Sequence, residues 1–598
     1  MLRYILLWGL LLPLTAFAQQ FSKGTVVDEA NLPLMGAEVY WNGTQIGVST
    51  DDNGTFTLKR TENSNTLVIS YIGYKTKTVK VTNSEALHIQ LEPQSALEEV
   101  VVTQKRANTM KSQWQVANLH TMSSGELLKA ACCNLSESFS TNPSIDVNFS
   151  DAVTGNKQIK MLGLTSPYIL MAEENIPAMR GASQAYGLSF VPGTWIESIQ
   201  ITKGAGSVIN GYESISGQIN YEIEKPINAR PFFLNLYTSE DSRYELNAHT
   251  KVKLSDKWAT SLLAHGNVRQ RKSDHNHDGF IDNPIGNQIN LLNRWQYSNA
   301  EKGWVSFVNL NYMKDERQAG QIDYNPLTDK GTTNAWGSEV NSERFTLSNK
   351  TGYVFPDTPY KSIGLQNSFQ SHRQDSYFGL NSYDIHQKSW YGNLIYNSII
   401  GNTQHKFATG LSGTYDDYNE QLTTSALAGD FSRIDRSVGA FFEYTYDNSS
   451  NFSFVAGIRA DSHNNLGNFI TPRFHLRYNP WKEATFRLSA GRGKRAANVI
   501  AENQQLLASS RQLHIIGGDG GKLYGLNPEI AWNYGASFLQ TFKIWGKNAE
   551  LSVDFYRTHF DNQVVVDLDH SPQQALFYNL DGKSFANSFQ TEVSITPV

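Results

Sequence analysis

Apolar and polar residues alternate along many segments of the chain after residue 230. In residues 452–461 one set of alternate positions is apolar and the other is mostly polar, and residues 485–490 and 551–556 repeat this arrangement. A strand places successive side chains on opposite faces, so each segment would have one face suited to lipid and one suited to water. A short polar turn at residues 447–451 precedes the first of these segments. The pattern predicts an antiparallel transmembrane β-barrel.

The first 18 residues have the three parts of a secretory signal peptide. Arg3 gives a positive start, residues 5–12 are apolar, and an A-x-A cleavage site precedes Gln19. This apolar run is shorter than the roughly 18 residues that a membrane-spanning helix needs, and no other stretch approaches that length. We therefore expect residues 1–18 to be removed on export and the mature chain to begin at Gln19.

Residues 19–94 show short alternating segments separated by turn signals. Phe56 and Leu58 alternate with polar neighbours, and residues 52–54 read Asp-Asn-Gly, which is a tight hairpin turn. The segment predicts a small β-sandwich. Asp51 and Asp52 could bind calcium, but a plain turn accounts for them better.

The composition and the absence of catalytic motifs argue against several classes of protein. Only 2 Cys occur in 598 residues, so no disulfide framework supports the fold. The formal net charge of -5 argues against a nucleic-acid binder, which needs a basic surface. No nucleophile–base pair or metal-hydrolase motif stands out, and we therefore expect no enzymatic activity.

Residues 196–226 form two alternating segments joined by glycine-rich turns. Taken alone, they could be an ordinary β-hairpin. Their length and the placement of their charges resemble the end of the plug domain of TonB-dependent outer-membrane receptors. The positions that carry this resemblance are Glu197, Ile199, Ile201, Lys203, Gly204, Gly211, Gly217, Ile219 and Asn220.

The resemblance covers most of the chain and implies its domain order. Residues 19–94 are similar to the carboxypeptidase-regulatory-like domain that Bacteroidetes place before such receptors. Residues 95–112 would be a linker, residues 113–227 the α/β plug and residues 228–598 the barrel. Within the linker, one acidic-then-apolar run resembles a TonB box, although it could also be an edge strand of the sandwich. The run consists of Leu97, Glu98, Glu99, Val100, Val101, Val102 and Thr103.

A receptor of this family implies a location, partners and an activity. It would lie in the outer membrane as a monomer in contact with lipid, bind a small-molecule or metal ligand, and import it actively when TonB pairs with the box as an added strand. No cofactor would be required. A soluble array of β-sandwiches, or a passive porin or adhesin, is the alternative.

The barrel region is short for this family. Plugged transporters close with 22 strands, whereas the alternation after residue 230 predicts roughly fifteen to seventeen, at about 9 to 11 residues each. The last residues also lack the aromatic end typical of the family. The pattern therefore predicts a truncated barrel whose C-terminal strands are missing.

Residues 274–282 resemble a calcium loop. Oxygen-bearing side chains occupy the first, third, fifth and ninth positions and a glycine the sixth, but Ile285 stands where a bidentate Glu is expected. A polar Asp-Gly turn is one alternative, and a transition-metal site on the two histidines is another. The candidate residues are Asp274, Asn276, Asp278 and Asp282, with His275 and His277.

Sulfur-bearing residues in the plug suggest a thiophilic cargo. Soft ligands favour Cu(I), so copper as the substrate is one interpretation, and packing in the plug core is the other. The residues are Cys132, Cys133, Met161, Met171 and Met179. Two motifs depart from the family pattern, at residues 159–164 and 171–177. We expect a metal ion or metal chelate as the substrate, which could be copper-like, a siderophore or cobalamin, and a small glycan ranks behind these.

Overall fold

The computed structural model describes residues 21–595, except 30, 45, 62–63, 72–73, 83–85, 93–108, 113–114, 130–133, 152, 449 and 518–522. The chain forms a small compact unit before Lys105 and a large one after it. Among the described residues, no helix has the length and apolar character needed to cross a membrane.

The small unit is a sandwich of two sheets, as the turn signals predicted. One sheet has the order β4-β1-β7 and the other β3-β2-β5-β6. Alternate residues of both sheets face the core, where Val39, Trp41, Phe56 and Leu58 are buried. The strands are β1 (Phe21–Val27), β2 (Glu38–Trp41), β3 (Gly47–Ser49), β4 (Thr55–Lys59), β5 (Thr66–Ser70), β6 (Lys77–Lys80) and β7 (Leu87–Gln90).

The first part of the large unit is the α/β plug. Its main sheet has the order β14-β13-β16-β15-β9-β8, and a second sheet has the order β10-β11-β12. The strands are β8 (Thr109–Lys111), β9 (Asn118–Ser123), β10 (Asp146–Phe149), β11 (Lys157–Met161), β12 (Leu164–Thr165), β13 (Ile169–Glu173), β14 (Ile176–Pro177), β15 (Ile196–Lys203) and β16 (Gly217–Ile223). The helices are α1 (Ser124–Lys129) and α2 (Leu135–Ser138), with 3-10 turns η1 (Ser166–Tyr168), η2 (Gly181–Ser183), η3 (Gly187–Phe190), η4 (Gly193–Trp195) and η5 (Val208–Asn210).

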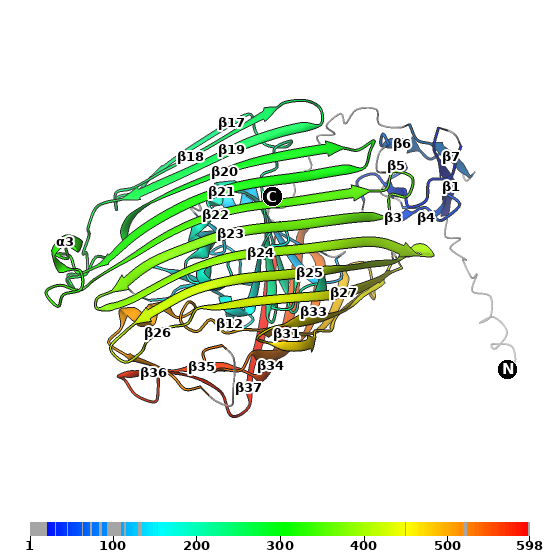
Figure 1. Ribbon diagram of the computed structural model, residues 1–598. Helices are drawn as coiled ribbons and strands as arrows, with labels where there is room; N and C mark the ends of the chain where they lie inside the picture. Colours follow the sequence, from blue (N-terminus) through cyan, green and yellow to red (C-terminus); the bar gives the residue numbers. More distant parts are fainter. Residues whose placement is uncertain are drawn as a thin grey trace, which may run out of the picture. The chain divides into compact units, whose positions relative to one another are not determined.

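The rest of the large unit is one antiparallel sheet that curves around the plug (Figure 1). It runs in chain order from β17 to β37, skipping only β32, β35 and β36. Its strands are β17 (Phe232–Thr238), β18 (Arg243–Lys253), β19 (Trp258–Arg269), β20 (Ile285–Asn299), β21 (Trp304–Gly320), β22 (Gly337–Val354), β23 (Ser362–Phe378), β24 (Asn381–Ile400), β25 (Asn402–Thr423), β26 (Ala428–Asp430), β27 (Arg433–Asp447), β28 (Phe452–His463), β29 (Gly467–Ile470), β30 (Arg473–Tyr478), β31 (Ala484–Arg495), β33 (Glu529–Ile544), β34 (Lys547–Asn562) and β37 (Ser584–Ile595).

The strand count agrees with the sequence pattern. The sheet contains 18 strands, but β26 shares its partner with β27, and β29 shares its partner with β30. The described residues therefore form 16 crossing segments, within the expected fifteen to seventeen. The predicted fold class, a β-sandwich followed by an α/β plug and an antiparallel barrel sheet, is confirmed.

The connections differ in length at the two ends of the sheet. At one end they are short, as at residues 300–303 and 545–546, and at the other they are long, as at residues 270–284 and 321–336. In barrels of this kind the short turns face the periplasm and the long loops face outward. The long loop between β31 and β33 carries η6 (Gln504–Ala508) and β32 (Gln512–Ile515), and a further loop carries β35 (Val564–Asp567) and β36 (Gln574–Asn579). The connection at residues 321–336 carries α3 (Pro326–Asp329).

Candidate functional site

The predicted plug motif forms the β15–β16 hairpin. Lys203 pairs with Gly217, and a Cβ on Gly217 would lie 2.6 Å from the carbonyl oxygen of Thr202, so only glycine fits there. Gly204 and Gly211 turn the chain with φ of 82° and 113°, in the region that favours glycine. Of the remaining motif residues, Ile199, Ile201 and Ile219 are buried in the plug core, and Glu197 and Asn220 make polar contacts within the plug. Glu197 forms an ion pair with Lys225 at 3.4 Å, and the side-chain oxygen of Asn220 accepts the Asn175 N–H at 2.7 Å.

Lys203 fixes this hairpin to the barrel wall. Its side chain is fully buried, and its Nζ lies 2.5 Å from Oδ2 of Asp554 and donates to Gln590 at 2.8 Å. Asn118 of β9 donates to the other oxygen of Asp554 at 3.2 Å. Burial lowers the pKa of Lys203, and the charge of Asp554 opposes that shift.

A second buried ion pair holds the plug on another part of the barrel. Arg294 of β20 donates to Oε1 of Glu174 at 2.6 Å, and both side chains are buried. Lys350 of β22 donates to the Glu174 carbonyl oxygen at 2.7 Å. Burial acts to raise the pKa of Glu174, but Arg294 and Lys350 outweigh it and hold the pKa below its usual value. Glu174 also has φ of 50°, in the left-handed region that non-glycine residues adopt at a cost in free energy.

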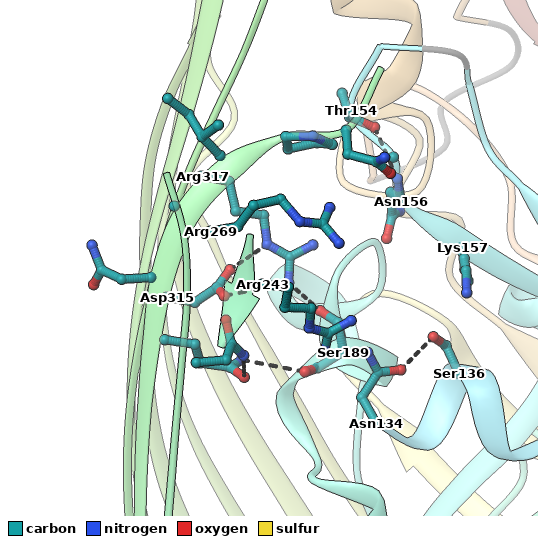
Figure 2. A pocket seen from close by; sticks show the side chains of 18 of the residues that line it. Asn134, Ser136, Thr154, Asn156, Lys157, Ser189, Arg243, Arg269, Asp315 and Arg317 are labelled. Carbon is teal, nitrogen blue, oxygen red and sulfur yellow. Dashed lines mark hydrogen bonds and ion pairs between the residues drawn. The ribbon is translucent and has the colours of Figure 1, made fainter. Parts of the chain in front are cut away.

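A cavity of about 300 Å³ lies between the plug and strands β18 to β21. Figure 2 shows arginine side chains reaching from these strands toward plug residues such as Asn156 and Ser189. The charged lining residues are Glu137, Lys157, Arg243, Arg269, Asp315, Glu316 and Arg317. This concentration of arginine makes it the candidate binding site.

Three of these arginines occupy one row across the sheet. Arg243 of β18 is the register partner of Arg269 of β19. Arg269 is opposite Gly286 of β20, and Gly286 is opposite Arg317 of β21. A Cβ on Gly286 would lie 1.9 Å from the Glu316 carbonyl oxygen, so this position has no side chain to fill the space between Arg269 and Arg317. We call Arg243, Arg269 and Arg317 the arginine row.

The members of the arginine row differ in their partners. Arg317 bonds to Asp315 at 2.6 Å and to the Ser189 hydroxyl at 2.5 Å. Arg243 bonds to Glu245 at 3.0 Å. The buried Nε of Arg269 has no hydrogen-bond partner among the described residues, and Figure 2 draws no interaction from Arg269 to the other residues shown.

Sequence reasoning missed the arginine row. Each arginine sits at an inward position of its strand, in the runs Arg243-x-Glu245, Asn267-x-Arg269 and Asp315-x-Arg317. The sequence feature that could have revealed the row is a charged residue at an inward position close to a long loop. The row depends on the registers between four consecutive strands, β18 to β21, and these could not be read from spacing.

The calcium-loop candidates form a hydrogen-bonded turn. Asp274 accepts the N–H groups of Asp278 and Gly279 at 3.1 and 3.0 Å, and Asn276 donates to Asp278 at 3.0 Å. His275 lies 2.6 Å from Asp282, and His277 has φ of 60°. Among the described residues, no three His, Cys, Asp or Glu side chains are placed together as a metal-ligand set. Calcium binding here stays a prediction.

Asp278→Ala tests that prediction. Loss of a central oxygen ligand should weaken calcium binding by the wild-type loop, with little change in barrel stability, because exposed loops open easily. His275→Ala combined with His277→Ala should leave calcium binding intact and reduce copper or zinc binding, since imidazole suits those metals. Titration calorimetry with each metal on both variants separates the two sites. Absence of any heat with the unmodified chain would reduce the motif to a solvated turn.

The structure brings the three candidate methionines into one hydrophobic cluster. Met161, Met171 and Met179 are all at least 96% buried there. Cys132, Cys133 and the TonB-box residues 97–103 lie outside the described residues. Copper binding by these sulfurs therefore stays a prediction.

Comparison with protein families gives three matches in chain order. Residues 22–102 match the CarboxypepD_reg-like domain, residues 114–218 the TonB-dependent receptor plug domain, and residues 205–590 the TonB-dependent receptor-like β-barrel.

Two curated relatives match shorter parts of the chain. TonB-dependent receptor SusC of Bacteroides thetaiotaomicron is 29% identical over 236 residues, which is 38% of this chain and 23% of that protein. TonB-dependent receptor P39 of Formosa agariphila is 34% identical over 98 residues, which is 16% of this chain and 9% of that protein. The chain thus matches less than a quarter of the length of either relative.

Two solved structures share the fold over most of both chains. The alcaligin outer-membrane receptor FauA of Bordetella pertussis aligns with a TM-score of 0.61 and 13% identity, over 82% of this chain and 81% of that one. The siderophore receptor PirA of Pseudomonas aeruginosa aligns with a TM-score of 0.56 and 13% identity, over 80% and 81%. At this identity the likeness concerns the fold.

Proposed function

The chain belongs to the TonB-dependent receptors, and we propose that it imports a scarce solute across the outer membrane in a step energised by TonB. Membership confirms the resemblance of the plug motif and of the N-terminal domain. The observation that supports active import is the plug itself, which is joined to the barrel strands by two buried ion pairs, Lys203–Asp554 and Glu174–Arg294. Moving a plug held in this way costs free energy. Such a plug therefore suits an energised transporter, since a passive pore needs an open channel.

The proposed source of that work is TonB pairing with residues 97–103. An added strand gains main-chain hydrogen bonds along its length, which suits it to transmit a pull. These residues lie just before the plug in the chain, so a pull on them reaches β8 and β9 first. Asn118 of β9 bonds to Asp554, which is also the partner of Lys203.

A metal chelate is our first choice of substrate. Support comes from the solved structure of PirA, which is named as a siderophore receptor, although the names of SusC and P39 mention no substrate. Copper remains a second candidate because of the plug sulfurs, and cobalamin and small glycan follow. No chemistry on the solute is proposed.

Uptake by cells tests the proposal. Cells with and without the full chain would receive a radiolabelled ferric chelate, cupric ion or cobalamin, each with and without an uncoupler. Energised import predicts accumulation of one of these solutes that needs both the chain and an energised inner membrane. Equal accumulation with and without the uncoupler would instead indicate a passive pore.

A further inference from the structure

We propose that the arginine row binds the oxyanion groups of the imported solute, so that the receptor selects an anionic ligand with at least two carboxylate or phosphate groups. This inference rests on the proposed function and deepens it by naming the charge class of the solute. It concerns the cavity between the plug and strands β18 to β21.

The first support is that Arg269 has no direct ion-pair partner. Each lining carboxylate already has a cation: Glu137 lies 3.4 Å from Lys157, Asp315 lies 2.6 Å from Arg317 and Glu316 lies 2.6 Å from Lys314. No carboxylate of the described residues forms an ion pair with Arg269 within 4.0 Å. Asp241 and Glu137 act on the charge of Arg269 only from beyond that distance, so its guanidinium is free to contact a ligand directly.

The second support is that the arginine row destabilises the sheet when no ligand is bound. Arg243 and Arg269 are direct cross-strand neighbours, and like charges directly opposite one another destabilise a sheet. The Nε of Arg269 is buried without a partner, which also costs free energy. An oxyanion would relieve both, because its oxygens accept from the guanidinium and offset the repulsion.

The third support is the shape of the space. Neighbouring strands lie about 4.8 Å apart, so the backbones at Arg269 and Arg317 are separated by roughly 10 Å, with only Gly286 between them. Planar guanidinium groups bind carboxylate or phosphate through two parallel hydrogen bonds. A ligand that spans this gap meets Arg269 with one anionic group and the Arg317 side with another. The volume of about 300 Å³ is at the small end for ligand sites.

The cavity is placed where a solute from outside could reach it. A larger hollow of about 540 Å³ is lined in part by the same residues, among them Arg269, Gly286 and Arg317. Both lie beside the long connection of residues 270–284, the end of the sheet that faces outward. The opposite wall is plug, including Asn156, Lys157 and Ser189. A bound anion would thus contact barrel and plug together, which would couple capture to the part that TonB moves.

Titration calorimetry on the full chain in detergent at low ionic strength tests the site. The probes are succinate, its uncharged analogue succinamide, and inorganic phosphate. We expect succinate to bind the unmodified chain more tightly than inorganic phosphate does, and succinamide not to bind. Tighter binding of succinate than of phosphate would support a ligand with two anionic groups, whereas equal or tighter binding of phosphate would overturn the two-group requirement.

Arg269→Gln should weaken anion binding roughly 10- to 100-fold, because a charged hydrogen-bond donor is lost. Arg269→Lys keeps the charge without the planar fork and should fall in between. The matched control is Arg373→Gln, since Arg373 is exposed on β23 and pairs with Asp375, and it should bind as the unmodified chain does. Arg269 has no side-chain partner to lose, so its replacement should not lower the thermal unfolding midpoint.

Equal binding of succinate and succinamide by the unmodified chain, or no binding of any anion, would overturn the inference even if a variant failed to fold. Unchanged anion affinity in Arg269→Gln would overturn it as well. Failure of the proposed function gives a different result: anions would bind in an Arg269-dependent manner, but cells would show no energised uptake.

Discussion

Replacing Val101 with proline is expected to abolish energised uptake while leaving solute binding to the purified receptor unchanged. Proline has no backbone N–H, and its ring restricts the backbone, so it cannot take part in a paired strand except at an edge. If residues 97–103 join TonB as an added strand, this change removes a main-chain hydrogen bond at its centre. Uptake of labelled solute by cells and binding by the purified chain are the two measurements.

The control for this experiment is Val101→Thr, which keeps the backbone N–H and the β-branched side chain and should transport at close to the normal rate. Val101→Pro that imports at the normal rate would show that these residues are not the TonB box. Loss of binding together with uptake would point to a folding defect in the neighbouring plug.

The barrel could be predicted because its pattern has a short period. Phe452, Phe454 and Ile458 alternate with Ser453 and Arg459 in the sequence, and in β28 Ile458 is exposed while Ser453 and Arg459 are buried. Strand pairing between sequence neighbours needs no long-range information, since short turns bring them together. The number of crossing segments could be predicted from the sequence for the same reason.

The contacts between plug and barrel could not be predicted in this way. Lys203 was selected as part of a turn motif, but its partner Asp554 lies 351 residues away. The sequence shows that Lys203 is a charged residue among otherwise apolar inward positions of its strand. Only the fold shows which carboxylate pairs with it. The arginine row was missed for a related reason, because three separate strand registers align it.

The hairpin at residues 171–177 could be located from the sequence but not explained by it. The sequence marked it as a departure from the family pattern without giving a cause. In the structure Glu174 is buried against Arg294 at 2.6 Å, and the following Asn175 donates its N–H to Asn220. Glu174 of this hairpin is therefore part of an ion pair that joins the plug to the barrel strands.

Lys203→Ala should loosen the plug more than any change to its surface. Removal of one partner of a buried ion pair leaves an uncompensated charge and typically costs about 3–5 kcal/mol, and Asp554 is only 3% exposed. A loss of about 3 kcal/mol corresponds to a roughly 100-fold larger population of the open state. Hydrogen exchange of peptides from β15 and β16, measured by mass spectrometry on the full chain in detergent, would report this change directly.

Two further variants decide how that result is to be understood. Lys203→Met combined with Asp554→Leu removes both charges and retains bulk, so exchange should return close to the normal rate, because well-packed apolar pairs often replace buried ion pairs without loss. Lys225→Ala removes a partly exposed pair with Glu197 in the same domain and should change the stability by at most about 1 kcal/mol. Exchange in Lys203→Ala that is no faster than in Lys225→Ala would mean that the buried pair does not hold the plug. Recovery in the double variant would show that Asp554 left unpaired, rather than lost packing, is what loosens it.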